Sequence, residues 1–265
     1  MKKILVTGST DGIGKLVAIK LAKDGHQIYL HGRNQEKLTK AIEEAKFDSG
    51  NENVSGFVAD FSDLSAVKSM SDEVKNDLES LDILINNAGV YNSSVPQNED
   101  ELDTRFVVNY LASYLLTKEL LTLLRYGNDA RVINLASAAQ APVDLEVLMG
   151  RRKASEPDTY AQSKLALIMW SFQLAENEKD LNVIAVNPGS LLHTKMALEA
   201  FGSFWSPAEK GADILYALAI SEKYKSVSGK YFNNDSGNFA QAHPDAYDNL
   251  KIGKLMKVTN EILER

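Results

Sequence analysis

The chain has 265 residues, of which 44% are hydrophobic and 25% are charged, and its formal net charge is -7. This apolar content is enough for one large domain, while the acidic charge argues against nonspecific binding to nucleic acid or to an anionic membrane. The absence of cysteine excludes disulfides, thiolate nucleophiles and zinc-cysteine sites, and the four histidines are too widely spaced to suggest a metal motif. No bound metal is therefore expected.

The chain begins with an apolar strand and a glycine-rich loop, at the place where a secretory signal would need its hydrophobic segment. No segment approaches the roughly 20 consecutive apolar residues of a membrane span. The sequence therefore predicts a soluble, cytoplasmic protein that does not bind membranes.

Short β-rich runs alternate with longer helical runs, a pattern typical of a parallel sheet with helices on both faces. The expected strands are 3–7, 27–31, 54–59, 83–86, 130–135, 182–186 and 230–232. The sequence therefore predicts an α/β fold, with a doubly wound parallel sheet of about seven strands in a single domain over residues 1–265. Residues 141–158 are expected to form an irregular surface insertion, because they combine proline, glycine and a basic cluster.

Three glycines, Gly8, Gly12 and Gly14, lie between the first strand and a helical segment over residues 15–23. They would permit a tight turn, a close approach of the backbone to a pyrophosphate, and an accessible helix N-terminus that favours an anion. The loop is therefore a candidate dinucleotide-binding site, together with its other members Ser9, Thr10, Asp11 and Ile13. The alternative is an ordinary strand-to-helix turn.

The second strand ends in Leu30-His31-Gly32-Arg33-Asn34, which should lie near the adenosine ribose of such a cofactor. A carboxylate here would bind a free 2′-hydroxyl, whereas an arginine without a carboxylate suits a 2′-phosphate. Gly32 stands where the acid is expected and Arg33 follows it, so the sequence favours NADP(H) over NAD(H). Arg33 could instead only face solvent near Glu36.

Two further strand ends carry candidate cofactor contacts. Asp60 and Phe61 follow the third strand, and Asp60 could either accept a hydrogen bond from the adenine amino group or cap the next helix. Asn87, Ala88 and Gly89 follow the fourth strand at the carboxyl edge of the sheet, where open α/β sheets bind their ligands.

Tyr160 and Lys164 stand four residues apart in a helical run, so they should share one face of a helix. A phenol has a reference pKa of about 10, and it needs a neighbour that stabilises phenolate before it can exchange protons at neutral pH. The ammonium of Lys164 would be that neighbour, and it would also lie beside any ligand along the same face. The two residues could otherwise be an interface residue and a solvated charge.

Four motifs, in this order, resemble those of the short-chain dehydrogenase/reductase family over nearly the whole chain. They are Thr7 to Gly14, Asn86 to Gly89, Asn134-Leu135-Ala136-Ser137 with Tyr160-Ala161-Gln162-Ser163-Lys164, and Asn187-Pro188-Gly189. The resemblance implies a Rossmann-type sheet and a nicotinamide cofactor that carries the hydride. It also implies cofactor contacts from Pro188, Gly189 and Thr194, and assembly into a homodimer or homotetramer.

The catalytic tetrad of that family corresponds to Asn109, Ser137, Tyr160 and Lys164. By this resemblance, Tyr160 exchanges a proton with the substrate oxygen, and its pKa is lowered by Lys164 and by the oxidised nicotinamide ring. Ser137 donates a hydrogen bond to the same oxygen, Lys164 also binds the nicotinamide ribose, and Asn109 positions a water molecule. A structural amide is the alternative for Asn109, and a strand-end cap is the alternative for Ser137.

The chain departs from the usual family pattern in three places. Tyr160 follows Ser137 by 23 residues, a longer interval than usual, because residues 141–158 intervene. This spacing, together with a helical tail over residues 243–265, resembles the retinol dehydrogenase-like branch. Ala136 stands where a serine often precedes the catalytic one, and the interval from Gly189 to Thr194 is one residue longer than usual.

Residues 190–206 are expected to form a substrate lid, and its side chains suit an apolar substrate. The apolar members are Leu191, Leu192, Met196, Leu198, Phe201, Phe204 and Trp205. Some of them could instead belong to an amphipathic helix packed on the core. The helix that follows Tyr160 has two apolar stripes, although packing on its own sheet needs only one. We expect the second stripe, formed by Leu167, Trp170 and Leu174, to pack against another copy of the chain.

The sequence thus predicts an NADP(H)-dependent oxidoreductase that transfers a hydride between nicotinamide and a small to medium, apolar carbonyl or alcohol substrate. The alternative is a noncatalytic NADP(H)-binding sensor or regulator, which the intact Ser137, Tyr160 and Lys164 disfavour. A light-dependent or other double-bond reductase is a third possibility, but the related pigment reductases use cysteine, which is absent here. The sequence names no particular substrate.

Overall fold

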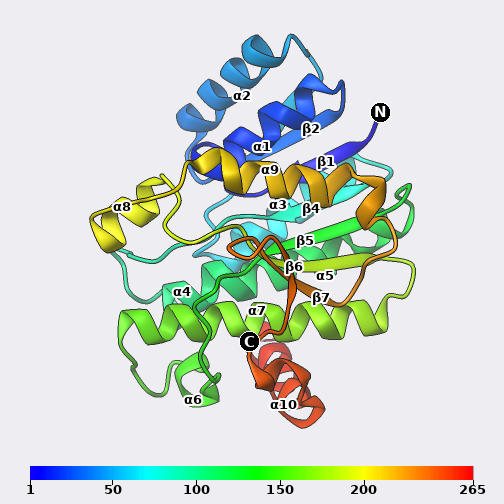
Figure 1. Ribbon diagram of the computed structural model, residues 1–265. Coiled ribbons are helices and arrows are strands. Elements are labelled where there is room, and N and C mark those ends of the chain that lie inside the picture. The colour runs from blue at the N-terminus through cyan, green and yellow to red at the C-terminus, as the bar shows by residue number, and fades with distance from the viewer. Residues whose placement is uncertain (265) are drawn as a thin grey trace.

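A sheet of eight strands runs through the molecule in the order β3-β2-β1-β4-β5-β6-β7-β8 (Figure 1). The strands are β1 (Lys3–Val6), β2 (Gln27–Gly32), β3 (Val54–Val58), β4 (Ile83–Asn86), β5 (Arg131–Leu135), β6 (Asn182–Asn187), β7 (Lys230–Asn233) and β8 (Asn238–Ala240). The computed structural model describes residues 1–264; Arg265 and the side chain of Phe201, which the sequence placed in the tail and the lid, lie outside the described residues.

The first seven strands are parallel, which confirms the predicted doubly wound α/β fold of the Rossmann type. The eighth strand, β8, pairs antiparallel with β7 and was not predicted. It has only three residues, of which Asn238 is exposed, so it lacks the apolar run by which the other strands are recognised.

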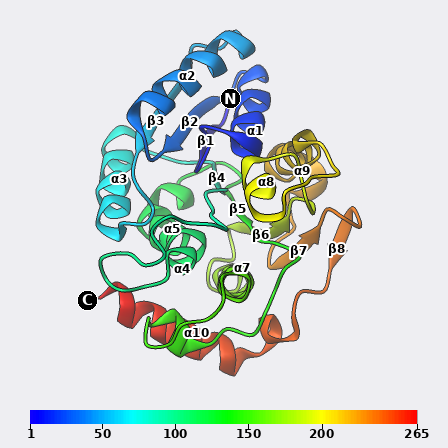
Figure 2. The ribbon, with the colours of Figure 1, turned by 90° about the vertical axis from the view of Figure 1, so that its left-hand side faces the viewer.

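Helices cover both faces of the sheet, as Figure 2 shows. One face carries α1 (Gly12–Lys23), α2 (Gln35–Ser49) and α9 (Ala208–Ile220), and the other carries α3 (Leu64–Asp77), α5 (Ala112–Arg125) and α7 (Glu156–Asn177). Because both faces are covered, strands such as β4 are fully buried, and β4 is apolar up to its last residue, Asn86. Each face therefore has its own hydrophobic core.

The shorter elements connect these layers. They are α4 (Thr104–Phe106), the π-helix η1 (Val107–Leu111), α6 (Leu145–Leu148), α8 (Lys195–Phe201), and the 3₁₀ helices η2 (Glu222–Tyr224) and η3 (Pro244–Tyr247). No helix within residues 1–264 is long and apolar enough to cross a membrane.

The expected insertion over residues 141–158 is less irregular than the sequence suggested. It contains α6, whose Val147 and Leu148 are buried, and it ends where Ser155 caps the N-terminus of α7 by accepting a hydrogen bond from the amide of Asp158. The helix therefore begins at Glu156, one turn before Tyr160. This start fixes the direction in which the Tyr160 side chain leaves the helix.

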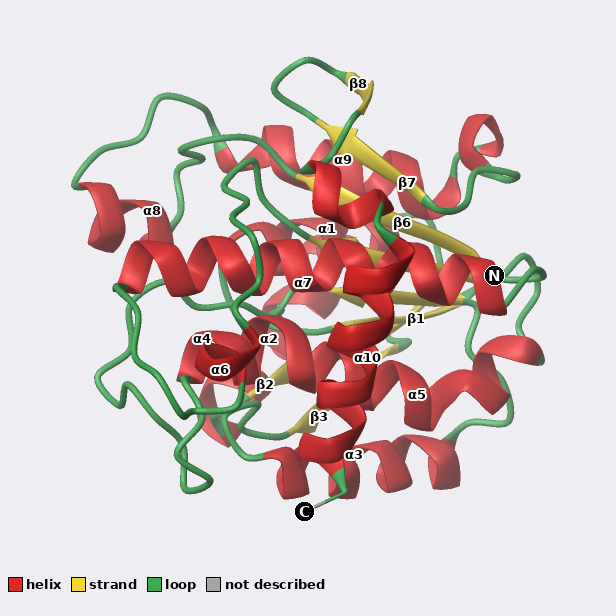
Figure 3. Cartoon of the chain, turned by 90° about the horizontal axis from the view of Figure 1, so that it is seen from below, coloured by secondary structure: helices red, strands yellow, loops and turns green. Residues whose placement is uncertain are grey.

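The second apolar stripe of α7 is buried within the same chain, so our expectation that it packs against another copy is wrong. Leu167, Trp170 and Leu174 are each less than a tenth exposed. The C-terminal helix α10 (Asn249–Leu263) lies across the outer side of α7 (Figure 3), and Trp170 also packs against Tyr114 with 5.4 Å between the ring centroids. The oligomeric state itself stays a prediction.

Candidate active site

A cleft of about 380 Å³ opens at the carboxyl ends of the parallel strands, where the sequence predicted the ligand site. The predicted site residues that line it are Gly8, Thr10, Asp11, Gly12, Ile13, Arg33, Asp60, Phe61, Asn87, Ala88, Gly89, Tyr160, Lys164, Pro188 and Thr194. Lys195 and Met196 of the expected lid also line it, and residues that the sequence did not assign to the site include His31, Gly32, Ala59, Val90, Val108 and Leu135. Ser9, Gly14, Asn109, Ser137 and Gly189 are not among the lining residues.

The glycine loop is held tightly against the end of β4. Asn87 Nδ2 donates hydrogen bonds to the carbonyl oxygens of Thr7 and Gly8, at 2.8 and 2.9 Å. Gly8 has a φ of +61°, and a Cβ atom at this position would lie 2.7 Å from Ala88 Cα. Only glycine fits such a position, and its backbone is therefore exposed to the cleft without a side chain.

Ser9, although predicted as a cofactor contact, points its side chain into the protein. Its hydroxyl donates to the carbonyl oxygen of Val6 at 2.8 Å and accepts from the amide of His31 at 2.9 Å, and the residue is fully buried. The hydroxyl therefore joins β1 to β2 rather than facing a ligand.

His31 is a feature of the site that the sequence did not identify. The amide of Gly8 donates to His31 Nδ1 at 3.0 Å, while Nε2 lies 3.0 Å from the carbonyl oxygen of Ala59. The ring also stacks on Phe61, with 4.1 Å between centroids. Burial lowers the pKa of His31 to about 4. The imidazole is thus neutral, with its proton on Nε2, and it links the glycine loop to the end of β3.

A side chain at the end of β2 would be crowded by Thr10. A Cβ atom on Gly32 would collide with Cγ2 of Thr10, so a carboxylate could be placed there only if Thr10 moved. Arg33 lines the cleft, is exposed, and makes no ion pair with any of residues 1–264. The possible neighbour Glu36 therefore does not neutralise it.

Asp60 fulfils only one of the two roles that the sequence left open for it, because it is free to contact a ligand but is not a helix cap. It lines the cleft, and its Oδ1 accepts hydrogen bonds from the amide and hydroxyl of Ser62 at 2.9 and 2.8 Å. It does not cap the next helix, because Asp63 is the N-cap of α3. The turn at Asp60 leaves its second carboxylate oxygen available to a ligand.

Tyr160 and Lys164 share one face of α7, as predicted, with Lys164 Nζ 5.8 Å from the centre of the Tyr160 ring. Lys164 Nζ donates to the carbonyl oxygen of Leu135 at 2.7 Å. Only 4% of Lys164 is exposed, and this burial lowers its pKa to about 8. The lysine is thus held at the end of β5, and its burial disfavours the charged form.

The pKa of Tyr160 differs from our expectation. Burial raises it above the ordinary value, and a hydrogen bond with the Ser137 hydroxyl opposes the rise without cancelling it. In the protein alone, desolvation of the phenolate thus outweighs any lowering of this pKa by Lys164. The lowering expected from Lys164 together with the oxidised nicotinamide ring stays a prediction.

Ser137 is positioned by residues far away in the sequence. Its carbonyl oxygen accepts hydrogen bonds from the Tyr231 hydroxyl at 3.0 Å and from Gln140 Nε2 at 3.1 Å. The amide of His243, at the start of the tail, donates in turn to Gln140 Oε1 at 2.7 Å. Burial raises the pKa of Tyr231 to about 12, so this phenol remains a hydrogen-bond donor.

Asn109 lies in the π-helix η1 and is fully buried. Its Oδ1 accepts from the amide of Val90 at 2.7 Å, and its Nδ2 donates to the Val90 carbonyl oxygen and to Ser163 Oγ, both at 3.0 Å. Three of the four hydrogen bonds available to an amide side chain are thus made within the protein. These contacts agree with the alternative reading of Asn109 as a structural amide. If this residue also binds the expected water molecule, it would do so chiefly through its main chain.

The loop after β6 is fixed by the turn between β7 and β8. Asp235 accepts hydrogen bonds from the amide of Ser190 at 2.8 Å and from Asn187 Nδ2 at 2.8 Å. Thr194 caps α8, since its hydroxyl accepts from the amide of Ala197 at 3.2 Å, and it lines the cleft opposite the glycine loop. Its hydroxyl keeps its donor for a ligand.

Together the fold and the cleft are typical of a dinucleotide-binding protein, and Tyr160, Lys164 and Ser137 lie close to one another beside the cleft. Comparison with known proteins gives the family. The family model for short chain dehydrogenases matches residues 2–202. Retinol dehydrogenase 13 of Mus musculus is 33% identical over 252 residues, covering 88% of this chain and 75% of that protein.

Two further similarities extend this result. Polyprenol dehydrogenase of Homo sapiens is 29% identical over 252 residues, covering 87% of this chain and 76% of that protein. A short chain dehydrogenase from Escherichia coli, solved in complex with NADPH, has a TM-score of 0.72 at 27% identity, covering 88% of this chain and 96% of that chain.

The chain belongs to the short-chain dehydrogenase/reductase family, in its retinol dehydrogenase-like branch. It is an oxidoreductase that acts on CH–OH and C=O groups, and its family binds a nicotinamide cofactor.

Proposed function

We propose that the protein is an NADP(H)-dependent oxidoreductase that interconverts a small to medium, apolar alcohol and its carbonyl compound, with Tyr160 as the general acid and base. The observation that carries this proposal is the arrangement of Tyr160, Ser137 and Lys164 at one end of the cleft. A phenol hydrogen-bonded to a serine hydroxyl, with an ammonium beside it, is suited to proton exchange with a substrate oxygen.

The cleft fits a nicotinamide dinucleotide. The glycine loop presents bare backbone beside the N-terminus of α1, which favours a pyrophosphate. Arg33 forms no ion pair with a carboxylate among residues 1–264, so its guanidinium is available for the 2′-phosphate of NADP(H). The contact that a side chain at residue 32 would make with Thr10 also disfavours an acid there, and an acid is what NAD(H) binding would favour. The similar Escherichia coli protein was solved with NADPH.

When bound, the cofactor would supply or accept the hydride, and the protein would supply everything else. In the reductive direction, the Ser137 hydroxyl would donate a hydrogen bond to the carbonyl oxygen, which increases its polarisation. The Tyr160 hydroxyl would give its proton to that oxygen as the C=O group becomes CH–OH. Lys164, which is anchored on Leu135, would bind the nicotinamide ribose and stabilise the phenolate that is left. Oxidation would reverse each transfer.

The lid supports an apolar substrate. Its two ends are joined where the amide of His193 donates to the carbonyl oxygen of Ser206 at 2.8 Å and the amide of Trp205 donates to Leu191 at 3.1 Å. Met196 of this segment lines the cleft, and Phe204 and Trp205 of the same segment are exposed. The names of the relatives, retinol and polyprenol dehydrogenases, also point to apolar alcohols.

NADPH oxidation in the presence of a panel of apolar aldehydes, ketones and quinones tests the proposal. The Tyr160→Phe variant should lose nearly all turnover and still bind NADPH with close to normal affinity. Retention of most turnover by this variant would refute the role of Tyr160. Tight NADPH binding by the wild type without turnover of any substrate would favour the noncatalytic sensor instead.

A further inference from the structure

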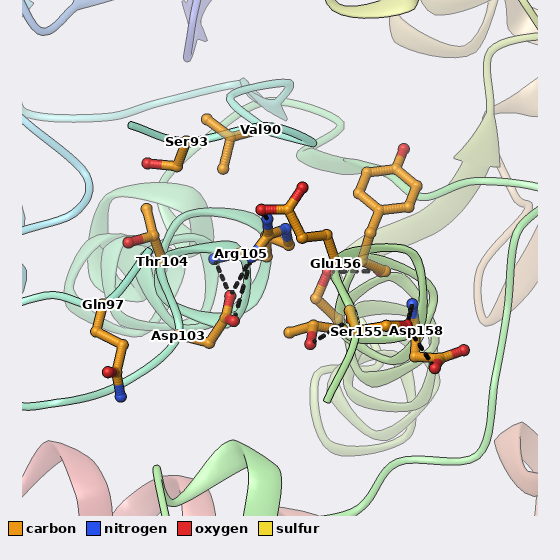
Figure 4. Close-up of polar contacts among 12 residues, drawn as sticks. Val90, Ser93, Gln97, Asp103, Thr104, Arg105, Ser155, Glu156 and Asp158 are labelled. Atoms are coloured by element: carbon orange, nitrogen blue, oxygen red, sulfur yellow. Dashed lines mark hydrogen bonds and ion pairs between the residues drawn. The ribbon is translucent and has the colours of Figure 1, made fainter. Parts of the chain in front are cut away.

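A buried arginine, Arg105, lies beside the proposed active site, and neither the sequence motifs nor the proposed mechanism uses it. Its side chain is only 2% exposed. Because a guanidinium cannot lose its charge and is costly to bury, an arginine in this place needs a complete set of partners. Figure 4 shows Asp103 and Glu156 on either side of its guanidinium.

The guanidinium of Arg105 joins three segments of the chain. Its Nε donates to the carbonyl oxygen of Tyr91 at 2.7 Å, and its Nη1 donates to both carboxylate oxygens of Asp103 at 3.2 Å. Its Nη2 lies 2.6 Å from Glu156 Oε1, an ion pair that is not aligned as a hydrogen bond. Asp103 caps the N-terminus of α4, and Glu156 is the first residue of α7.

Arg105 and Asn109 support the same loop and the same helix. Asn109 makes two hydrogen bonds to the backbone of Val90, and Arg105 binds the carbonyl of the next residue, Tyr91. Asn109 also bonds to Ser163 of α7, while Arg105 pairs with Glu156 at the start of that helix. The α4–η1 segment is thus attached twice to the loop and twice to α7.

Both attachments made by Arg105 lead to Tyr160. Glu156 precedes Tyr160 by one helical turn, so the ion pair holds the turn from which the phenol projects. The ring of Tyr91, whose carbonyl Arg105 binds, packs on the ring of Tyr160 with 4.8 Å between centroids. The phenol is therefore supported on two sides by groups that Arg105 holds.

We propose that Arg105 is a positioning residue for the reaction: by holding Tyr91 and the first turn of α7, it keeps the Tyr160 phenol aligned with the substrate oxygen. This inference rests on the proposed function and adds a residue that touches neither cofactor nor substrate. Arg105→Lys keeps the positive charge, but an ammonium cannot reach three segments in a fixed planar geometry.

The Arg105→Lys variant should lower kcat roughly 10- to 100-fold, because small misplacements of a reacting group have effects of this size. NADPH affinity should stay within about twofold of the wild type, since the glycine loop is untouched. Arg125→Lys is the matched control: Arg125 binds Glu178 at the other end of the same layer, through Nε at 3.0 Å and Nη2 at 2.6 Å. It should leave kcat unchanged.

A double-mutant cycle with Tyr91→Leu separates positioning from general destabilisation. If Arg105 acts through the Tyr91 ring, Arg105→Lys should have a clearly smaller effect on kcat in the Tyr91→Leu background. An unchanged kcat in Arg105→Lys would overturn the proposal, and fully additive effects would overturn the part of it that runs through the Tyr91 ring. If Arg105→Lys folds poorly, Glu156→Gln is the second variant, because it removes only the ion pair between Arg105 and the partly exposed Glu156. It should also lower kcat, but by less than Arg105→Lys.

Hydrogen exchange provides a readout that does not depend on turnover. Arg105→Lys should speed amide exchange in residues 89–92 and 156–160 but not in the glycine loop, whereas Arg125→Lys should change neither. Unchanged exchange in both segments would refute the role of Arg105 even if the protein had no enzymatic activity. A wild type without turnover, combined with faster exchange in the variant, would refute the proposed function alone.

Discussion

The amide of Gly8 donates a 3.0 Å hydrogen bond to Nδ1 of His31, so the first turn of the cofactor loop depends on the protonation state of a buried imidazole. Protonation of Nδ1 would remove the acceptor and place a second donor against the Gly8 amide. The glycine loop should therefore be sensitive to acid.

We predict that the wild-type protein loses stability as the pH falls from about 6.5 to about 4. The folded-state pKa of His31, about 4, lies below the unfolded value of about 6.5, so the unfolded chain binds the extra proton in this window. The full effect is about 3 kcal/mol in the free energy of unfolding. Urea denaturation at a series of pH values measures it, with His31→Gln, which keeps one donor and one acceptor, as the reference. Identical slopes for the two proteins would contradict the prediction.

Lys164→Met should stabilise the protein at pH 7 while it destroys activity. The wild type buries a charged lysine whose pKa has fallen from 10.5 to about 8, and methionine fills similar space without the charge. The gain should be about 1–3 kcal/mol, after the lost hydrogen bond to Leu135 is allowed for.

This gain has a characteristic pH dependence. Between about pH 8 and 10.5 the unfolded wild type binds more protons than the folded form, so the wild type becomes more stable as the pH rises. The difference in the free energy of unfolding between Lys164→Met and the wild type should therefore become smaller. Thermal or urea unfolding at pH 7 and pH 10 tests both statements. A Lys164→Met protein that is less stable than the wild type at pH 7 would show that burial of this charge is fully compensated.

Arg33→Ala should weaken NADPH binding by roughly 10- to 100-fold and leave NADH binding nearly unchanged, because a charge-assisted contact to the 2′-phosphate would be lost. Fluorescence titration with the two cofactors measures the ratio. Lys40→Ala, on the exposed side of α2, serves as the control for a general loss of positive charge. Equal weakening of both cofactors by Arg33→Ala would refute the assignment of Arg33 to the 2′-phosphate.

Leu255→Ala should cost roughly 2–5 kcal/mol, because Leu255 is fully buried where α10 packs on the body of the protein. Lys254→Ala, at the neighbouring exposed position, should change the free energy of unfolding by less than about 0.5 kcal/mol. Urea denaturation compares them. A small effect of Leu255→Ala would mean that α10 is only loosely attached to α7.

The sequence predicted the features that depend on neighbours along the chain. The seven parallel strands are short apolar runs between helices, and the Tyr160–Lys164 relationship follows from helical spacing alone. The family motifs were recognised for the same reason, because each consists of one or two short continuous segments. The roles assigned to the individual site residues stay predictions, which the variants above test.

The sequence did not reveal the residues that support the site from a distance. His31 binds an amide 23 positions away, Tyr231 binds Ser137 across 94 positions, and Asp235 binds Ser190 across 45. Such contacts form only after the sheet has assembled, so no local sequence pattern predicts them. The direction of the Tyr160 pKa shift was missed for a related reason, because it depends on how deeply the fold buries the pair.

The second apolar stripe of α7 is covered by α10, a segment of the same chain that is covalently linked to α7. The tether keeps the effective concentration of this covering helix constant, however dilute the protein becomes. A surface covered by a second molecule would instead be uncovered on dilution. Trp170 should therefore keep the fluorescence of a buried indole down to nanomolar protein, and the order of the α7 helix that carries Tyr160 should not vary with expression level.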